Sequence, residues 1–277
     1  MDQIMIDQIM INTIRNRAME CRARVGVGID TINEFIVSDI KRAHAFADVV
    51  LIGDAEQISA ISTDLAIIHS DKPEEELVRQ LIDKKIDAAV RGTLSATKTL
   101  GYLKSALRIT GLRRLALLTA ADGTPFFLAP VGIDEGSSPS DKIDLVCEGV
   151  SYIARFGITA KVAVLSGGRF EDAGRSEIVD QSLADGELVA DRLCSLGIDA
   201  EHYGILIEDA VRDANFIVAP DGITGNLIFR TLTFLGGGDG FGAPVLMDLV
   251  FVDTSRVKTN LSNAIMLASA LAWTADR

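Results

Sequence analysis

Four turns between an apolar run and a helical pattern carry hydroxyl, amide and guanidinium groups that a plain connector does not need. They read RGTLSATK at residues 91–98, SGGRFEDAGRS at 166–176, APDGITGN at 219–226 and DTSRVKTN at 253–260. A helix start offers free backbone N–H groups and the positive end of the helix dipole, and both favour an anion. Three of the four turns also contain an arginine, and all four junctions are candidate binding sites for a phosphate or a carboxylate.

The candidate ligand-binding residues of the first three junctions share small size, a hydroxyl or amide group, or a positive charge. Consecutive glycines let the backbone approach a ligand, and an arginine beside them can grip a phosphate with two parallel hydrogen bonds. An Asn in the first turn of a helix is a poor helix former, which hints at a ligand. The candidates are Arg91, Gly92, Thr93, Ser95, Thr97, Ser166, Gly167, Gly168, Arg169, Thr224, Gly225 and Asn226.

A plainer interpretation stands beside each junction. Ser and Thr are ordinary helix caps, and the Gly-Gly-Arg loop is compatible with a solvated surface loop. In the fourth junction Arg256 can pair with one of the many acidic residues, or it can neutralise negative charge that develops on a ligand. The residue types alone leave both interpretations open.

The segments around the junctions alternate between short β-rich runs and longer helical patterns. Strands are predicted at 24–29, 48–53 and 87–92, and the Asp-Gly turn at 121–124 suits a hairpin. Residues 242–255 are expected to form one strand. Strand–helix alternation predicts an α/β fold with largely parallel sheets, in which ligands gather at the carboxyl ends of the strands.

The Pro- and Ser-containing stretch EGSSPSD at 135–141 is the best candidate for a passage between two domains. We therefore expect an N-terminal α/β domain over residues 1–135, completed by a C-terminal helix within 254–277. A second α/β domain is expected over residues 136–253.

The composition excludes several classes of function. Of the 277 residues, 48% are hydrophobic and 24% are charged, and the formal net charge of −12 repels nucleic acid and anionic membranes. No apolar run is long enough to span a membrane, and no clustered His, Cys and Asp set indicates a metal site. The three histidines, His44, His69 and His202, lie outside all four junctions. We expect a cytoplasmic protein whose isolated cysteines are small buried groups: Cys21, Cys147 and Cys194.

The order of the junctions resembles the phosphate acetyl/butyryltransferases. VAVLSGG at 162–168, DANFIVAPDGITGN at 213–226 and DTSR at 253–256 follow one another as the corresponding motifs do in that superfamily. The segments GRFEDAGRSE, PDGITGNLIFRTLTFLGGG and FVDTSR resemble more closely the methanogen marker proteins called MtxX, a branch named as methyltransferases. The resemblance covers most of residues 24–270.

The resemblance implies two Rossmann-like α/β/α domains of the isopropylmalate-dehydrogenase-like architecture, with a cleft between them, and a homodimer. It implies a small anionic substrate in the cleft, with Ser255 and Arg256 as catalytic residues. By this resemblance coenzyme A and phosphate are possible ligands, but no cofactor is firmly predicted. Neither nucleic acid nor a membrane is expected as a partner.

The chain departs from the acyltransferases after Ser255 and Arg256, because no acidic residue occurs before Asp276. The aspartate proposed as a base in those enzymes is therefore missing, and Asp209 or Asp221 is a candidate replacement. Transfer of an acyl or a methyl group is the leading hypothesis. The alternative is a non-catalytic binding or assembly protein that keeps the acyltransferase fold.

Overall fold

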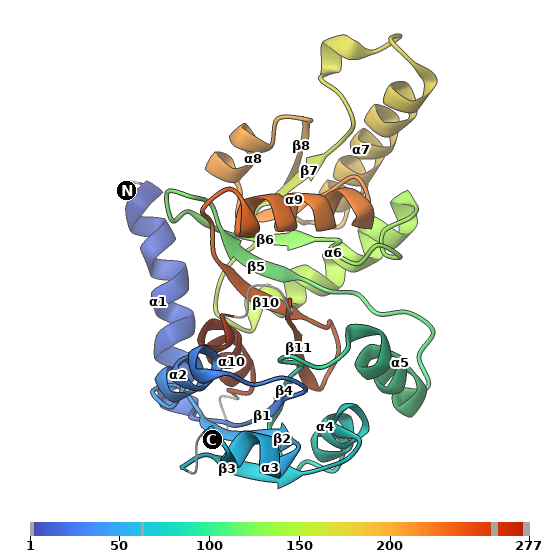
Figure 1. Ribbon diagram of the computed structural model, residues 1–277. Helices are drawn as coiled ribbons and strands as arrows, with labels where there is room; N and C mark the ends of the chain where they lie inside the picture. The colour runs from blue at the N-terminus through green and yellow to red at the C-terminus, as the bar shows by residue number, and fades with distance from the viewer. Residues whose placement is uncertain (1–2, 62–63, 256–259, 274–277) are drawn as a thin grey trace. The chain divides into compact units, whose positions relative to one another are not determined.

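The computed structural model describes residues 3–61, 64–255 and 260–273, which form two compact α/β units (Figure 1). The terminal unit is built from both ends of the chain, Ile11–Leu112 and Gly240–Arg277. The central unit comprises Arg113–Asp239 together with Met1–Met10. The α/β class expected from the sequence is thus confirmed.

The terminal unit holds one sheet whose strands run in the order β3-β2-β1-β4-β11-β10. All neighbouring strands are parallel except β10 and β11. The strands are β1 (Arg24–Gly28), β2 (Asp48–Gly53), β3 (Ala66–His69), β4 (Ala88–Val90), β10 (Gly240–Pro244) and β11 (Val250–Asp253). The helices are α1 (Gln3–Cys21, which begins in the central unit), α2 (Glu34–Ala43), α3 (Ala55–Ser59), α4 (Pro73–Ile82), α5 (Ala96–Leu107) and α10 (Leu261–Leu271).

Local sequence explains the helices that cover this sheet. Helix α4 begins with Pro73 at its first turn, and three glutamates follow, which the positive dipole end favours. Its apolar residues Leu77 and Leu81 are buried against the sheet. In Figure 1, α4 and α5 lie on one side of the sheet, and α2 and α10 lie on the other. A sheet covered on both faces accounts for the continuous apolar strands.

The central unit holds a second sheet, in the order β5-β6-β9-β7-β8. Strands β5 and β6 form the expected antiparallel hairpin, and the other neighbours are parallel. The strands are β5 (Ala116–Thr119), β6 (Pro125–Ala129), β7 (Val162–Leu165), β8 (Ala200–Gly204) and β9 (Phe216–Val218). The helices are α6 (Pro139–Ala154), the short 3₁₀ helix η1 (Phe170–Asp172), α7 (Glu177–Ser195), α8 (Ile207–Asp213) and α9 (Gly222–Phe234).

The two units divide the chain at residues 112 and 239, whereas the sequence placed the boundaries at 135 and 253. Strand pairing supplies the physical reason. Strand β6 pairs with β9, so residues 125–129 belong with the later part of the central unit. Strand β11 pairs with β4, so residues 250–253 belong with the terminal unit.

Two further expectations need correction. Residues 242–255 do not form one strand: the chain bends over residues 246–249 and returns antiparallel as β11. The cysteines are not buried, since Cys21 and Cys147 are half-buried and Cys194 is exposed on α7, with its thiol donating to the Ala200 carbonyl at 3.0 Å. None of the helices in the described part of the chain is both long and apolar enough to cross a membrane.

Candidate functional site

In the terminal unit, the first junction follows β4, which lies between the parallel strands β1 and β11. Gly92 takes a φ of +62°, and a Cβ there would lie 2.1 Å from the Gly28 carbonyl oxygen. The next residue, Thr93, donates its backbone N–H to that same oxygen at 3.0 Å. Gly92 is therefore required by the close approach of two backbone segments as well as by its left-handed conformation.

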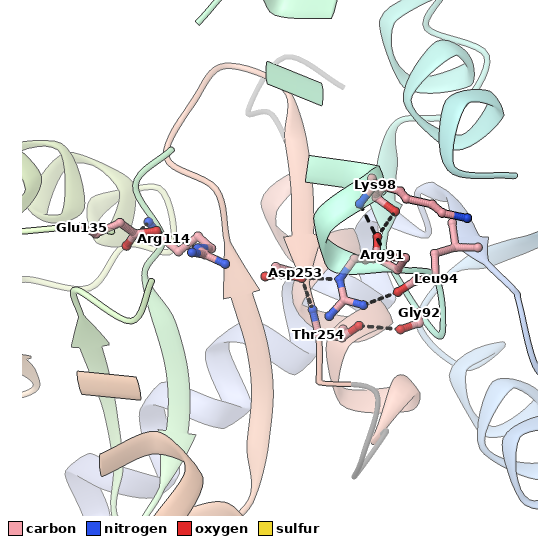
Figure 2. A network of polar contacts seen from close by, with 10 residues as sticks. Arg91, Gly92, Leu94, Lys98, Arg114, Glu135, Asp253 and Thr254 are labelled. Atoms are coloured by element: carbon pink, nitrogen blue, oxygen red, sulfur yellow. Dashed lines mark hydrogen bonds and ion pairs between the residues drawn. The ribbon is translucent and has the colours of Figure 1, made fainter. Parts of the chain in front are cut away.

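Arg91 forms a buried ion pair in this junction. Its Nε donates to Asp253 Oδ1 at 2.5 Å, its Nη1 donates to the Leu94 carbonyl at 2.5 Å, and the residue is 3% exposed (Figure 2). Thr254 adds a backbone donor to the same Asp253 oxygen at 2.9 Å and bonds the Gly92 carbonyl through its hydroxyl. The positive charge that the sequence assigned to a ligand is thus paired within the unit.

The hydroxyl groups of the first junction have different surroundings. Thr93 Oγ1 accepts from the backbone N–H groups of Asp30 and Thr31 and donates to the Thr31 carbonyl. Ser95 caps α5 by accepting from the Lys98 N–H at 3.5 Å, and Thr97 is exposed in the first turn of the helix. Two of the three hydroxyls therefore hold the backbone, and one faces solvent.

The fourth junction lies only partly within the described residues. Ser255 is half-buried shortly after β11. Arg256, the sequence's main catalytic candidate, lies outside the described residues, so its role stays a prediction.

In the central unit, the glycines of the third junction allow helix α9 to pack closely on the loop after β6. A Cβ on Gly222 would lie 1.7 Å from the Gly132 carbonyl oxygen, and one on Gly225 would lie 1.9 Å from the Pro130 carbonyl oxygen. Neither position has room for a side chain. Backbone packing thus explains both glycines without a ligand.

Polar groups of the same turn also bond within the unit. Asp221 caps α9 by accepting from the Thr224 N–H at 2.7 Å. Asn226 Nδ2 donates to the Val131 carbonyl at 2.9 Å. The Asn that looked out of place in a helix therefore ties α9 to the loop after β6.

That loop is held from its other side by a second ion pair. Arg114 Nε donates to Glu135 Oε1 at 2.7 Å, and the Glu135 side chain is almost fully buried (Figure 2). The Glu135 backbone carbonyl accepts from the Gly222 N–H at 3.1 Å. The third junction thus rests on a rigid scaffold.

Lys142, which sequence reasoning did not single out, lies beside the third junction. It is 5% exposed, and its Nζ donates to the Pro220 carbonyl at 3.0 Å. Burial lowers the pKa of its ammonium group, while the charges of Asp185 and Asp221 act in the opposite direction. Lys142 lies in α6, 78 residues before Pro220, so no local pattern in the sequence pointed to this contact.

The second junction follows β7 and contains an exposed arginine. The Gly167 N–H donates to Ser182 Oγ at 2.8 Å, and the Arg169 N–H donates to Asp172 Oδ2 at 3.0 Å. The hydrogen bond from Arg169, followed by that from Arg175, holds the pKa of the Asp172 carboxyl below its ordinary value. Gly168 is buried against Val179, and the Arg169 side chain is exposed.

His202 lies outside the four junctions in the sequence, but in the structure it contacts the second junction. His202 Nε2 lies 2.9 Å from Ser166 Oγ, and Nδ1 lies 3.0 Å from Glu187 Oε2. The imidazole is buried, and the Phe170 ring meets it edge-on at a centroid distance of 5.0 Å. The contact was hidden because Ser166, which directly follows β7, and His202 on β8 lie 36 residues apart.

The second and third junctions lie at the same edge of the central sheet. Val164 of β7 is paired in parallel with Val218 of β9. Ser166 and Pro220 each follow two residues beyond this pair, so the two turns leave neighbouring strands at the same level. Among the residues described, no group of three His, Cys, Asp or Glu side chains is placed to hold a metal ion.

Solved structures with this fold define the class of protein. A branched-chain phosphotransacylase from Enterococcus faecalis V583 is similar over 90% of this chain and 98% of its own, with a TM-score of 0.68 and 18% identity. The EutD phosphotransacetylase from Staphylococcus aureus is similar over 96% and 99%, with a TM-score of 0.68 and 14% identity. The chain therefore has a phosphotransacetylase-type fold.

Sequence relatives narrow the assignment. A Methanosarcina acetivorans protein named "Putative methyltransferase mtx subunit X" is 54% identical over 267 residues, which are 95% of this chain and 95% of that protein. A Methanosarcina barkeri protein of the same name is 55% identical over 92% of this chain and 95% of its own. No protein-family model matches the chain. The chain belongs to the family of mtx subunit X proteins, as its resemblance to MtxX indicated.

Proposed function

We propose that this protein binds a phosphorylated or otherwise anionic small molecule at the carboxyl edge of the central sheet and transfers a group to or from it. The observation that supports this most is the common level of Ser166 and Pro220 on paired strands. It brings the exposed Arg169 loop, the start of α9 and the buried Lys142 to one edge. In a chain with a net charge of −12, two cations at a sheet edge favour an anion there.

For the terminal unit, the prediction that the first and fourth junctions bind an anion stays part of the proposal. Gly92, Thr93, Ser95 and Thr97 would supply groups from the first junction, and Arg256 would stabilise developing negative charge. Thr97 is exposed in the first turn of α5, so its hydroxyl is accessible to a ligand.

The sequence relatives and the fold favour two different transferred groups. The names of the family members favour a methyl group, transferred in methanogen metabolism. The fold favours an acyl group carried between phosphate and a thiol such as coenzyme A. We propose group transfer as the function common to both. We also propose that the protein is a homodimer, and light scattering can measure the mass of the particle in solution.

Binding can be tested separately from turnover. Inorganic phosphate should raise the Tm of the protein, and isothermal titration should give a Kd that weakens about tenfold or more in Arg169→Ala, since a charged hydrogen bond is lost. Arg175→Ala is the matched control, because Arg175 is exposed in the same loop but is paired with Asp172 at 2.7 Å. Equal weakening in both variants, or no binding by the parent, would reject the anion site.

Turnover distinguishes the two kinds of transfer. Acetyl phosphate with coenzyme A tests the acyl version, and a corrinoid or pterin that copurifies with the protein would favour the methyl version. Binding without turnover would favour the alternative, a non-catalytic binding protein. One observation favours that alternative: Asp221, a candidate base, is already used as the cap of α9.

A further inference from the structure

We propose that Ser166 is an activated nucleophile that accepts an acyl group from an ester or thioester, with His202 as its base and Glu187 as the residue that positions His202. This inference uses only residues of the central unit. It shares Ser166 with the proposed anion site, but its labelling test does not depend on anion binding.

The hydrogen-bond chain has the geometry of an activated hydroxyl. Ser166 Oγ lies 2.9 Å from His202 Nε2, and His202 Nδ1 lies 3.0 Å from Glu187 Oε2. An ionised carboxylate only accepts, so Nδ1 carries the proton and Nε2 is left as the acceptor of the Ser166 hydroxyl proton. Nucleophile, base and orienting carboxylate within this reach are the shared features of serine acyl-transfer sites.

The backbone holds the serine and the histidine in register. His202 lies opposite Val164 in the parallel pairing of β7 and β8, and the register then shifts, so that Leu165 pairs with Gly204. The Ser166 N–H donates to the Gly204 carbonyl at 2.8 Å. Register irregularities of this kind re-aim side chains and are common next to active sites.

Helix α7 makes room for the imidazole at a cost to its own stability. A Cβ on Gly186 would lie 2.4 Å from His202 Nε2, so any side chain at this position would have to displace the imidazole. A glycine inside a helix is less stable than alanine by about 1 kcal/mol. The neighbouring Glu187 then reaches the other ring nitrogen. Gly186 thus lowers the stability of α7 but leaves space for the His202 ring.

Among the described residues, the site lies beside one backbone N–H group that is not yet paired, since the neighbouring Gly167 N–H already donates to Ser182 Oγ. Gly167 and Gly168 follow Ser166 directly, and within the described part of the chain the Gly168 N–H has no hydrogen-bond acceptor. Ser166 is 2% exposed, but the adjacent Gly167 is exposed and bears no side chain. Because Ser166 is almost fully buried, we expect it to accept a small acyl group rather than a bulky one.

Acyl transfer to Ser166 begins with attack by its hydroxyl oxygen. A bond forms between Ser166 Oγ and the acyl carbon, and the hydroxyl proton moves to His202 Nε2, where the Glu187 carboxylate stabilises the imidazolium. The bond from the acyl carbon to the thiolate or alkoxide breaks, and the leaving group takes the proton from His202. Water or an acceptor thiol then removes the acyl group by the reverse sequence.

Covalent labelling with diisopropyl fluorophosphate tests the nucleophile without knowledge of the substrate. Mass spectrometry of the full-length protein should show one phosphoryl adduct, located on the peptide that contains Ser166, and Ser166→Ala should show none. His202→Gln should label at least about a hundredfold more slowly, because a base is lost. Ser151→Ala should label like the parent, since this exposed serine of α6 donates its hydroxyl to the Cys147 carbonyl and takes no part in the proposed reaction.

The positioning role of Glu187 has its own test. Glu187→Gln should slow labelling roughly tenfold, and Glu187→Asp should restore most of the rate, because orientation by a carboxylate is retained. Circular dichroism and Tm report folding, and His202→Asn replaces His202→Gln if the latter is unfolded. An unlabelled parent, an adduct that persists in Ser166→Ala, or an unchanged rate in both folded His202 variants would overturn the proposal.

Discussion

Arg91 and Asp253 are 162 residues apart in the chain, yet they form a buried ion pair with Nε 2.5 Å from Oδ1. The pair joins the ends of two adjacent parallel strands, β4 and β11. It therefore links the first junction of the sequence to the fourth.

Removal of one partner should destabilise the protein strongly. We expect Asp253→Asn to lower the free energy of unfolding by about 3 kcal/mol, since a buried cation is left without its counter-charge. Urea unfolding followed by circular dichroism measures this. Lys98→Ala is the control, because that lysine is mostly exposed and 3.7 Å from Glu74, where an ion pair contributes little. Equal effects of the two substitutions would contradict a buried-pair role.

Gly225→Ala should be severely destabilising, by about 3 kcal/mol or more, since the new Cβ meets the Pro130 carbonyl at 1.9 Å and overpacking forces the backbone apart. Gly101→Ala offers a matched comparison inside α5, where a Cβ meets nothing within 4 Å. That substitution should stabilise the protein by about 1 kcal/mol through helix propensity. Thermal unfolding of the two variants should therefore move in opposite directions.

Lys142 should make the free energy of unfolding depend on pH in the alkaline range. Its folded-state pKa is lowered by burial, so the unfolded chain binds more protons between this pKa and the ordinary value of about 10.4. The parent should therefore gain stability relative to Lys142→Met as pH rises through that window, and show a constant difference below it. Urea titrations at several pH values measure the difference, and a constant offset across the window would contradict the prediction.

Tyr152 carries a hydroxyl that is buried and has no hydrogen-bond partner among the described residues. Burial raises its pKa to about 12. Tyr152→Phe should leave stability unchanged or raise it by about 1 kcal/mol, because no partner is left unsatisfied when the hydroxyl is removed. A clear loss of stability in chemical unfolding would show that the hydroxyl has a partner after all.

Gly186→Ala should separate packing around His202 from ordinary helix propensity. Alanine would normally favour α7, but the added Cβ would displace the imidazole from Ser166. We expect a loss of stability together with at least about tenfold slower labelling of Ser166, since the base is misplaced. Gly101→Ala again serves as the comparison and should label like the parent.

Much of the fold could be predicted because local patterns determine it. Strand–helix alternation predicted the α/β class, and the Asp-Gly turn predicted the hairpin of β5 and β6. The family was predicted correctly from a few turn motifs, since strand-to-helix turns that need particular glycines leave a recognisable spacing. Gly222 and Gly225 show why, because each position excludes any side chain.

The candidate site was harder to predict, because its contacts connect distant parts of the chain. The sequence around Arg91 does not predict its contact with Asp253, and the sequence around Ser166 does not predict its contact with His202. The glycine inside α7 was the available signal for the histidine, since an interior helical glycine often marks a close approach. The domain boundaries expected from the sequence differ from the division into two units for a related reason, because strand partners rather than linker composition decide which residues belong together.

The split construction of the terminal unit has a consequence for biosynthesis. Strand β4 is followed by more than half of the chain before its partner β11 is translated, and until then one side of β4 has no neighbour. The central sheet is contiguous in sequence, so all its strands leave the ribosome before residue 240. During synthesis the central unit can therefore complete its sheet first. The terminal unit can complete its sheet only after the last segment of the chain has emerged.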